Sequence, residues 1–142
     1  MDRRGRGRLT PDNPAAAHAD RRLGTLEAMH TTPLLVAGLC AQWCGTCREY
    51  RPLFEREAQA FGERARFVWV DVEDHAEVMG PIDVEDFPTL MIARGDQILF
   101  FGTVTPHAQT LARLVQSALA GDLKPVPDVS LTGLPQRVRD AV

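Results

Sequence analysis

Apolar residues in the middle of the chain fall into two nearly continuous runs. Residues 33–41 read PLLVAGLCA and residues 66–72 read RFVWVDV. Short runs of this kind, rich in β-branched and aromatic residues, are typical of strands in the interior of a sheet covered on both faces. The pattern therefore predicts two central strands.

Helical spacing follows the first run and returns near the end of the chain. Residues 48–61 and 105–121 are both expected to form helices, with Thr105 as the cap, Pro106 at the first position and Gly121 closing the second one. Residues 19–30 and 74–80 predict a first helix and a short helical turn. The apolar positions of the two main helices are Tyr50, Leu53, Phe54, Ala58, Phe61, Leu111, Leu114, Val115, Ala118 and Leu119.

Two cysteines, Cys44 and Cys47, stand where the first strand passes into a helix. This spacing allows a small, easily reversed disulfide, which indicates redox chemistry rather than structural cross-linking. Cys44 is expected at the helix N-terminus, where free N–H groups and the positive end of the dipole favour a thiolate. Cys47, about one turn further on, is placed to attack the mixed disulfide that Cys44 forms. The residues predict Cys44 as nucleophile and Cys47 as resolving thiol.

Two other uses of the cysteines were compared with this one. A zinc site needs two further ligands, and the four histidines, at 18, 30, 75 and 107, occur singly. Cys40 extends the pattern to Cys-X3-Cys-X2-Cys, which resembles the iron–sulfur spacing of radical-SAM enzymes, but those require a far longer barrel domain. We expect neither a metal nor a cofactor.

Four features together resemble the thioredoxin family, over roughly residues 22–120. The first is the pentapeptide Trp-Cys-Gly-Thr-Cys at 43–47, in which Thr46 stands where thioredoxins proper usually carry proline. The second is Pro52 inside the following helix. The third is the segment 87–89, Phe-Pro-Thr, which is similar to the family's cis-proline loop. The fourth is the ending: strands at 90–93 and 97–101 around a turn at Gly95, then a last helix.

The resemblance implies an α/β fold, a thioredoxin-like three-layer α/β/α arrangement with a central mixed sheet. It also implies a cis peptide bond before Pro88, and a loop whose backbone at Phe87 and Thr89 can pair with an extended substrate. Trp43 would form an apolar lip beside the nucleophile. The substrate-binding residues expected on this basis are Trp43, Gly45, Thr46, Phe87, Pro88 and Thr89.

Two positions depart from the family pattern. The aspartate that thioredoxins usually bury beneath the dithiol, as a proton acceptor, is replaced here by Gly38, and a lysine often found beside it by Trp69. Cys40, on the first predicted strand, is expected to be a small buried hydrophobic residue, and the sharper alternative is a third redox thiol.

Length and composition bound the organisation of the chain. With 142 residues, 44% hydrophobic and 25% charged, the chain suits one globular domain. We expect a disordered basic arm at 1–20, the domain at 21–121 and a proline-containing extension at 122–142. The net charge of −3 indicates no particular partner, and we expect neither nucleic-acid nor membrane binding. No apolar leader or membrane-length run occurs, which favours a cytoplasmic location.

These observations predict a thiol–disulfide oxidoreductase that reduces protein disulfides through Cys44 and Cys47. Its expected partners are disulfide-containing proteins and a thioredoxin reductase. The alternative is a non-enzymatic interaction module of the same fold, whose dithiol only senses redox state.

Overall fold

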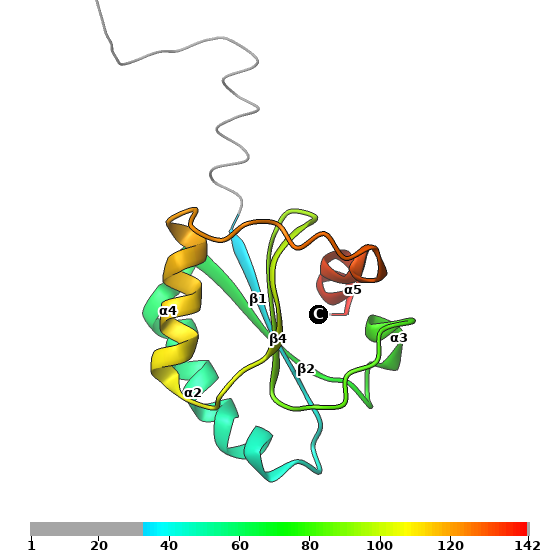
Figure 1. The fold of residues 1–142 in the computed structure, drawn as a ribbon. Coiled ribbons are helices and arrows are strands. Elements are labelled where there is room, and N and C mark those ends of the chain that lie inside the picture. Colours follow the sequence, from blue (N-terminus) through cyan, green and yellow to red (C-terminus); the bar gives the residue numbers. More distant parts are fainter. Residues whose placement is uncertain (1–32, 142) are drawn as a thin grey trace, which may run out of the picture. The chain divides into compact units, whose positions relative to one another are not determined.

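A computed structural model of the protein describes residues 33–141, drawn in colour in Figure 1. The predicted basic arm at 1–20 and the predicted helix at 19–30 lie outside the described residues. Within 33–141, no helix has both the length and the hydrophobicity needed to cross a membrane.

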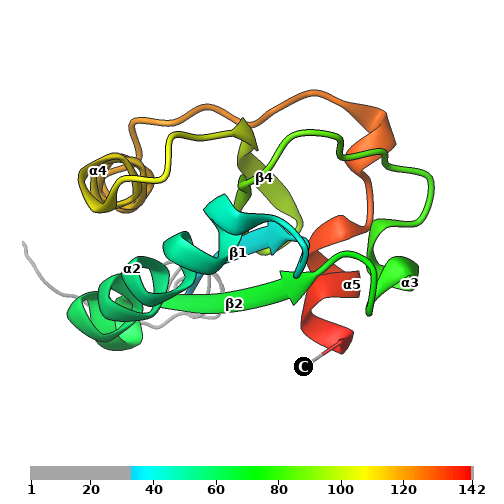
Figure 2. The same cartoon turned by 90° about the horizontal axis from the view of Figure 1, so that it is seen from below.

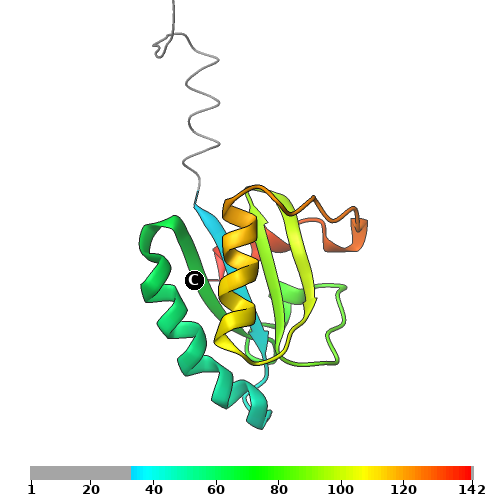
Figure 3. The ribbon, with the colours of Figure 1, turned by 60° about the vertical axis from the view of Figure 1, so that its left-hand side comes forward.

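A mixed sheet forms the centre of this part of the chain. Among residues 33–141 it has four strands in the order β2-β1-β3-β4 (Figure 3). β1 (Leu34–Cys40) is parallel to β2 (Ala65–Asp71) and antiparallel to β3 (Thr89–Arg94), which is antiparallel to β4 (Gln97–Thr103). The predicted strands agree with these bounds to within two residues.

All seven residues of β1 are buried, because helices cover both faces of the sheet. Side chains alternate between the faces of a strand. Leu34 and Val36 pack into one apolar cluster, whereas Leu35, Ala37 and Leu39 pack into the other. The continuous apolar run is therefore explained by a strand with no solvent-facing side.

The two long helices cover the face of the sheet that carries Leu34 and Val36, called here the first face, as Figure 2 shows from below. α2 (Gly45–Phe61) contains Pro52 in its interior, as predicted, and α4 (Ala108–Leu119) crosses beside it. α4 begins later than the sequence suggested: its N-cap is His107, and the hydroxyl of Thr105 is 3.0 Å from that of Thr110. The helical side chains buried on this face are Tyr50, Phe54, Phe61, Leu111, Val115 and Ala118.

The second face is covered by α3 (Ala76–Met79) and α5 (Leu134–Asp140) (Figure 2). A 3-10 turn at Val129–Leu131 precedes α5, and another at Gly62–Arg64 follows α2. Leu131, Leu134 and Val138 are each at most 4% exposed and belong to this half of the core. Residues 122–141 therefore form part of the compact unit rather than an extension beyond it, and the predicted three-layer α/β/α fold is confirmed.

Candidate active site

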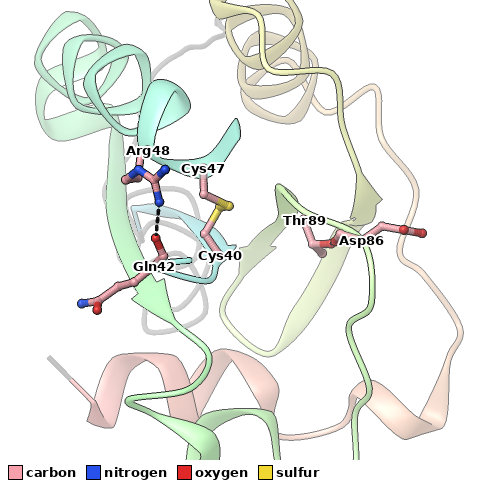
Figure 4. The surroundings of a disulfide bond; sticks show 6 residues. All are labelled: Cys40, Gln42, Cys47, Arg48, Asp86 and Thr89. Carbon is pink, nitrogen blue, oxygen red and sulfur yellow. Dashed lines mark hydrogen bonds between the residues drawn. A yellow bond between two sulfur atoms is a disulfide. The ribbon is translucent and has the colours of Figure 1, made fainter. Parts of the chain in front are cut away.

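A tight turn joins β1 to α2 and presents the cysteines. The amide of Cys44 donates to the carbonyl oxygen of Ala41 at 3.1 Å, and Cys44 is the N-cap of α2. Arg48 Nη1 donates to the carbonyl oxygen of Gln42 at 2.8 Å, which ties the turn to the first turn of the helix (Figure 4). The position expected for Cys44 at the start of a helix is confirmed.

Cys44 carries the free thiol of the site. It is partly exposed, its side chain makes no capping hydrogen bond, and it is the one of the chain's three cysteines without a disulfide partner. A partly exposed thiol at this point is suited to nucleophilic attack.

Cys47 is bonded to Cys40 rather than to Cys44 (Figure 4). The bond joins the last residue of β1 to the first turn of α2, with Cα atoms 5.8 Å apart, and the two cysteines are 1% and 2% exposed. The expectation that Cys40 is a free, merely hydrophobic residue was therefore wrong, because the first turn of α2 brings Cys47 over the end of β1. The roles of Cys44 and Cys47 in exchange stay predictions.

Trp43 links the cysteine turn to two other loops. Trp43 is 63% exposed, its Nε1 donates to Glu73 Oε2 at 2.7 Å, and its ring packs edge to face with that of Phe87, with centroids 5.8 Å apart. The first contact reaches the loop after β2, and the second reaches the loop before β3. The structure thus brings the rings of Trp43 and Phe87 together, and their role as a substrate lip stays a prediction.

The loop before β3 is fixed against the sheet. The Phe87–Pro88 peptide bond is cis, and Pro88 is buried, with its carbonyl oxygen accepting from the amide of Val104 at 3.0 Å. Thr89 Oγ1 donates to the carbonyl oxygen of Asp86 at 2.7 Å. Thr89 is also the partner of Leu39 in the β1–β3 register, which places the loop next to the end of β1 that carries Cys40.

Gly45 and Thr46 are exposed in the first turn of α2, between the two cysteines of the motif. The six residues expected to bind substrate therefore lie on three neighbouring segments: the turn, the start of α2 and the cis-proline loop. Their contacts with a substrate stay predictions.

Aromatic rings occupy the place where the family pattern has an aspartate. Gly38 is paired with Trp69 across β1 and β2, and a Cβ atom on it would lie 3.1 Å from Trp69 and 3.2 Å from Phe54. The Tyr50 ring packs against both of these rings. Burial, and to a smaller extent the charge of Glu57, raises the pKa of Tyr50 to about 12. This cluster of Gly38, Tyr50, Phe54 and Trp69, all of them described by the structure, contains neither a carboxylate nor an ammonium group.

A cavity of about 350 Å³ lies beside Cys47, a feature that the sequence analysis missed. The Arg51 guanidinium lies 5.5 Å from the centre of the Trp69 ring on its wall. Arg48 and Arg51 are three residues apart in α2, so both lie on one side of the helix. This spacing was the signal in the sequence from which the wall of the cavity could have been predicted. The lining residues are Ala41, Gln42, Cys47, Arg48, Arg51, Trp69 and Asp71.

Comparison with known proteins agrees with this geometry. The sequence model of the family described as thioredoxin matches residues 26–117. The chain is 38% identical to thioredoxin H2-1 of rice over 84 residues, which cover 58% of this chain and 60% of the rice protein. It is 27% identical to the thioredoxin of Bacillus subtilis over 86 residues, covering 61% of this chain and 83% of that protein. It therefore spans less than two thirds of the rice protein's length.

Solved structures show the same fold. The thioredoxin of Fasciola hepatica superposes with a TM-score of 0.55 and 25% identity, over 68% of this chain and 90% of that one. The germline-specific thioredoxin Deadhead of Drosophila melanogaster gives a TM-score of 0.56 at 22% identity, with the same coverage.

Proposed function

From the premise that the chain belongs to the thioredoxin family, we propose that it reduces disulfide bonds of client proteins through Cys44 and Cys47. The family and the fold support a thiol–disulfide oxidoreductase in general terms. The observation that carries the finer proposal is the partly exposed free thiol of Cys44 at the N-terminus of α2, with Cys47 one turn further along the helix.

The first step is attack on the client. The Cys44 thiolate attacks one sulfur of a client disulfide, forms a mixed disulfide and releases the other client sulfur as a thiolate. Only Cys44 is placed for this step, because Cys40 and Cys47 are 1% and 2% exposed. The step requires an unmodified Cys44, which is the state in the structure.

The second step releases the client. The Cys47 thiol loses its proton and attacks Cys44 Sγ, which forms the Cys44–Cys47 disulfide and frees the second client thiolate. Cys47 must be reduced for this step, so the Cys40–Cys47 bond seen in the structure has to be opened first. Two electrons pass from the dithiol to the client in one cycle.

The client is held by the surface around Cys44. Trp43 and Phe87 present adjoining rings, and Gly45, Thr46, Pro88 and Thr89 complete the patch beside them. An extended segment next to the client disulfide pairs with the backbone of the cis-proline loop. The protein works in the cytoplasm, where a thioredoxin reductase returns it to the dithiol state.

Trapping with single-cysteine variants tests the assignment. The chain has three cysteines, so Cys40→Ala with Cys47→Ser leaves Cys44 alone, and Cys40→Ala with Cys44→Ser leaves Cys47 alone. Incubation with insulin should give a stable mixed disulfide with the first variant, because attack is retained and escape is lost. The second variant should give none, because Cys47 is buried.

The adducts are measured on non-reducing gels and by intact mass. Equal trapping by the two variants would contradict the assignment of Cys44 as the nucleophile. Turnover by the unmodified protein is measured as insulin reduction with dithiothreitol as the electron donor.

A redox-sensing interaction module is the second candidate. The Cys40–Cys47 disulfide favours it, because a buried bond in the core is shielded from clients. Catalytic turnover of insulin separates the two, since a sensor would change state once and then stop.

A further inference from the structure

We propose that Cys40 is a third catalytic thiol. After each reduction of a client it attacks Cys47 and replaces Cys44 as the disulfide partner of that residue. The oxidised protein then holds the Cys40–Cys47 disulfide and presents a free Cys44 thiol again. This inference rests on the proposed Cys44/Cys47 cycle and extends it by one internal exchange.

Cys47 lies within reach of two partners. It follows Cys44 by three residues in the first turn of α2, a spacing that puts side chains on the same side of a helix. It is bonded to Cys40 in the structure. Cys47 is therefore the shared member of two alternative disulfides, and the structure shows the one that the Cys-X-X-Cys motif does not predict.

The backbone holds these sulfurs in place. The carbonyl oxygen of Cys40 accepts from the amide of Val72 at 2.8 Å, and Cys40 is paired with Asp71 at the end of β2. On the other side, the bond from Arg48 to the Gln42 carbonyl fixes the turn against α2. Exchange between Cys40 and Cys44 at Cys47 therefore needs side-chain movement rather than rearrangement of the strand.

Exposure determines the route to the observed bond. Cys40 and Cys47 are 1% and 2% exposed, whereas Cys44 is partly exposed. A protein disulfide cannot reach either buried thiol directly. Oxidation of the buried pair by a protein client has to pass through Cys44, which first forms the mixed disulfide and then the Cys44–Cys47 bond.

The additional step needs no outside oxidant. The Cys40 thiol loses its proton and attacks Cys47 Sγ, so the Cys40–Cys47 bond forms and the Cys44–Cys47 bond breaks. Cys44 leaves as a thiolate and can take up the proton. One disulfide is present before and after, so the two electrons already given to the client are the only ones transferred. In the reverse step, Cys44 attacks Cys47 and returns the disulfide to the surface for reduction.

The exchange changes what the oxidised protein can do. With Cys44 free and Cys47 bonded to Cys40, the protein can attack a second client but has no resolving thiol with which to release it. The second client stays covalently bound until the buried disulfide is reduced. The third thiol thus makes client release depend on the redox state of the core.

Mapping of the disulfide tests the inference on the full chain. The protein is reduced with dithiothreitol, freed of it, oxidised with one equivalent of insulin disulfide bonds so that no second client is available to Cys44, quenched with acid and alkylated with iodoacetamide. Chymotrypsin and trypsin then separate residues 40–43 from residues 44–48, so that Cys40 lies on one peptide and the other two cysteines on the second. We expect the two peptides to be linked, with one alkyl label at Cys44.

Other outcomes of the map would overturn the inference. An alkylated 40–43 peptide, together with an internal disulfide in 44–48, would show that Cys40 takes no part. A Cys40–Cys47 bond that survives the initial reduction would make it a static cross-link. If insulin thiols are released and the first result is found, the inference falls and the proposed function stands. A bond that survives reduction leaves Cys47 unable to resolve, so that result overturns both the inference and the proposed cycle. If the protein releases no insulin thiols, both are overturned as well.

Two variants separate the steps. Cys40→Ala should retain no alkylatable cysteine after oxidation, compared with one per chain in the unmodified protein. Cys44→Ser should lose the formation of the Cys40–Cys47 bond by insulin, while a small oxidant such as diamide still forms it. Formation by insulin at an unchanged rate in Cys44→Ser would show that the buried pair is oxidised without Cys44, and would overturn the proposed route.

Discussion

At the scale of single residues, Gly38 decides what lies beneath the cysteines. It leaves room for the rings of Trp69 and Phe54, which approach to 3.1 and 3.2 Å of the place where a Cβ atom would stand. Distances this short require neighbouring atoms to shift. Glycine in place of the family's aspartate thus leaves the space that the ring of Trp69, on the neighbouring strand β2, fills.

Substitution of Gly38 tests that packing. Gly38→Ala should lower the free energy of unfolding by about 1 kcal/mol, through crowding of the two rings. Gly38→Asp should lower it by about 3 kcal/mol, because its carboxylate is also desolvated without a partner. Chemical denaturation measures both values. Equal losses in the two variants would mean that the carboxylate reaches water, and that the cluster is more open than the structure shows.

Tyr50 gives the fold a dependence on alkaline pH. Its pKa is raised from 10.0 to about 12, chiefly by burial, and its hydroxyl has no hydrogen-bond partner among the described residues. A raised pKa means that the unfolded chain releases the proton first. The free energy of unfolding is therefore unaffected by this group below pH 10. It falls as the pH rises towards 12, by about 3 kcal/mol in total.

Titration measures this effect directly, because Tyr50 is the only tyrosine in the chain. Tyrosinate absorbance should rise about 2 pH units later in the native protein than in denaturant. Tyr50→Phe should leave stability near neutral pH almost unchanged, because the hydroxyl is unpaired, and should flatten the alkaline loss. A native midpoint near that of the denatured chain would contradict the burial of the phenol.

The chemistry of individual residues was only partly predictable from sequence. The turn position of Cys44 follows from a strand running into a helix, which local patterns reveal. The bond from Cys47 to Cys40 does not, because it depends on how the first turn of α2 lies over the end of β1. Spacing along the chain favoured Cys44 as the partner, whereas the three-dimensional arrangement brings Cys40 equally within reach.

At the scale of elements, α5 is the part that sequence patterns assigned least well. Residues 122–142 contain three prolines, which resemble a tail, and α5 spans only Leu134–Asp140. Its position is fixed by tertiary contacts: Arg137 Nε donates to the carbonyl oxygen of Val78 at 2.6 Å, which joins α5 to α3. The hydrophobic periodicity of so short a helix is a weak sequence signal, and a hydrogen bond between residues 59 positions apart leaves no local sequence signal at all.

Truncation of one side chain in α5 measures its contribution. Leu134 is fully buried, so Leu134→Ala should lower the free energy of unfolding by 2–5 kcal/mol, as expected for large-to-small changes in a core. Gln136→Ala, on the exposed side of the same helix, should change it by about 0.5 kcal/mol or less. Similar small losses in both variants, in denaturant titrations, would show that α5 contributes little to the core.

At the scale of the whole molecule, the second face of the sheet depends on the C-terminal residues. Leu131, Leu134 and Val138 cover Leu35 and Leu39 together with their neighbours in one apolar cluster. Burial of three such side chains contributes about 5–9 kcal/mol. That amount is comparable to the total stability of a typical domain, about 5–15 kcal/mol.

A chain ending at Gly121 should therefore lose cooperative unfolding. Its thermal transition should broaden, and it should bind the dye ANS, because one face of the sheet is uncovered. Calorimetry and dye fluorescence, compared with the full chain, measure this change. A sharp transition at an unchanged temperature would show that residues 122–141 are dispensable for the core.

The late position of α5 also affects how the protein is made. A ribosome delivers the chain from its N-terminus, so β1, β2 and β3 emerge well before the helix that covers their second face. Until residue 138 has emerged, Leu35, Leu39 and Met91 of the nascent sheet have only α3, and not α5, to cover them. An apolar surface left open in this way is of the kind that chaperones recognise, and the three cysteines reach the solvent while the fold is still incomplete.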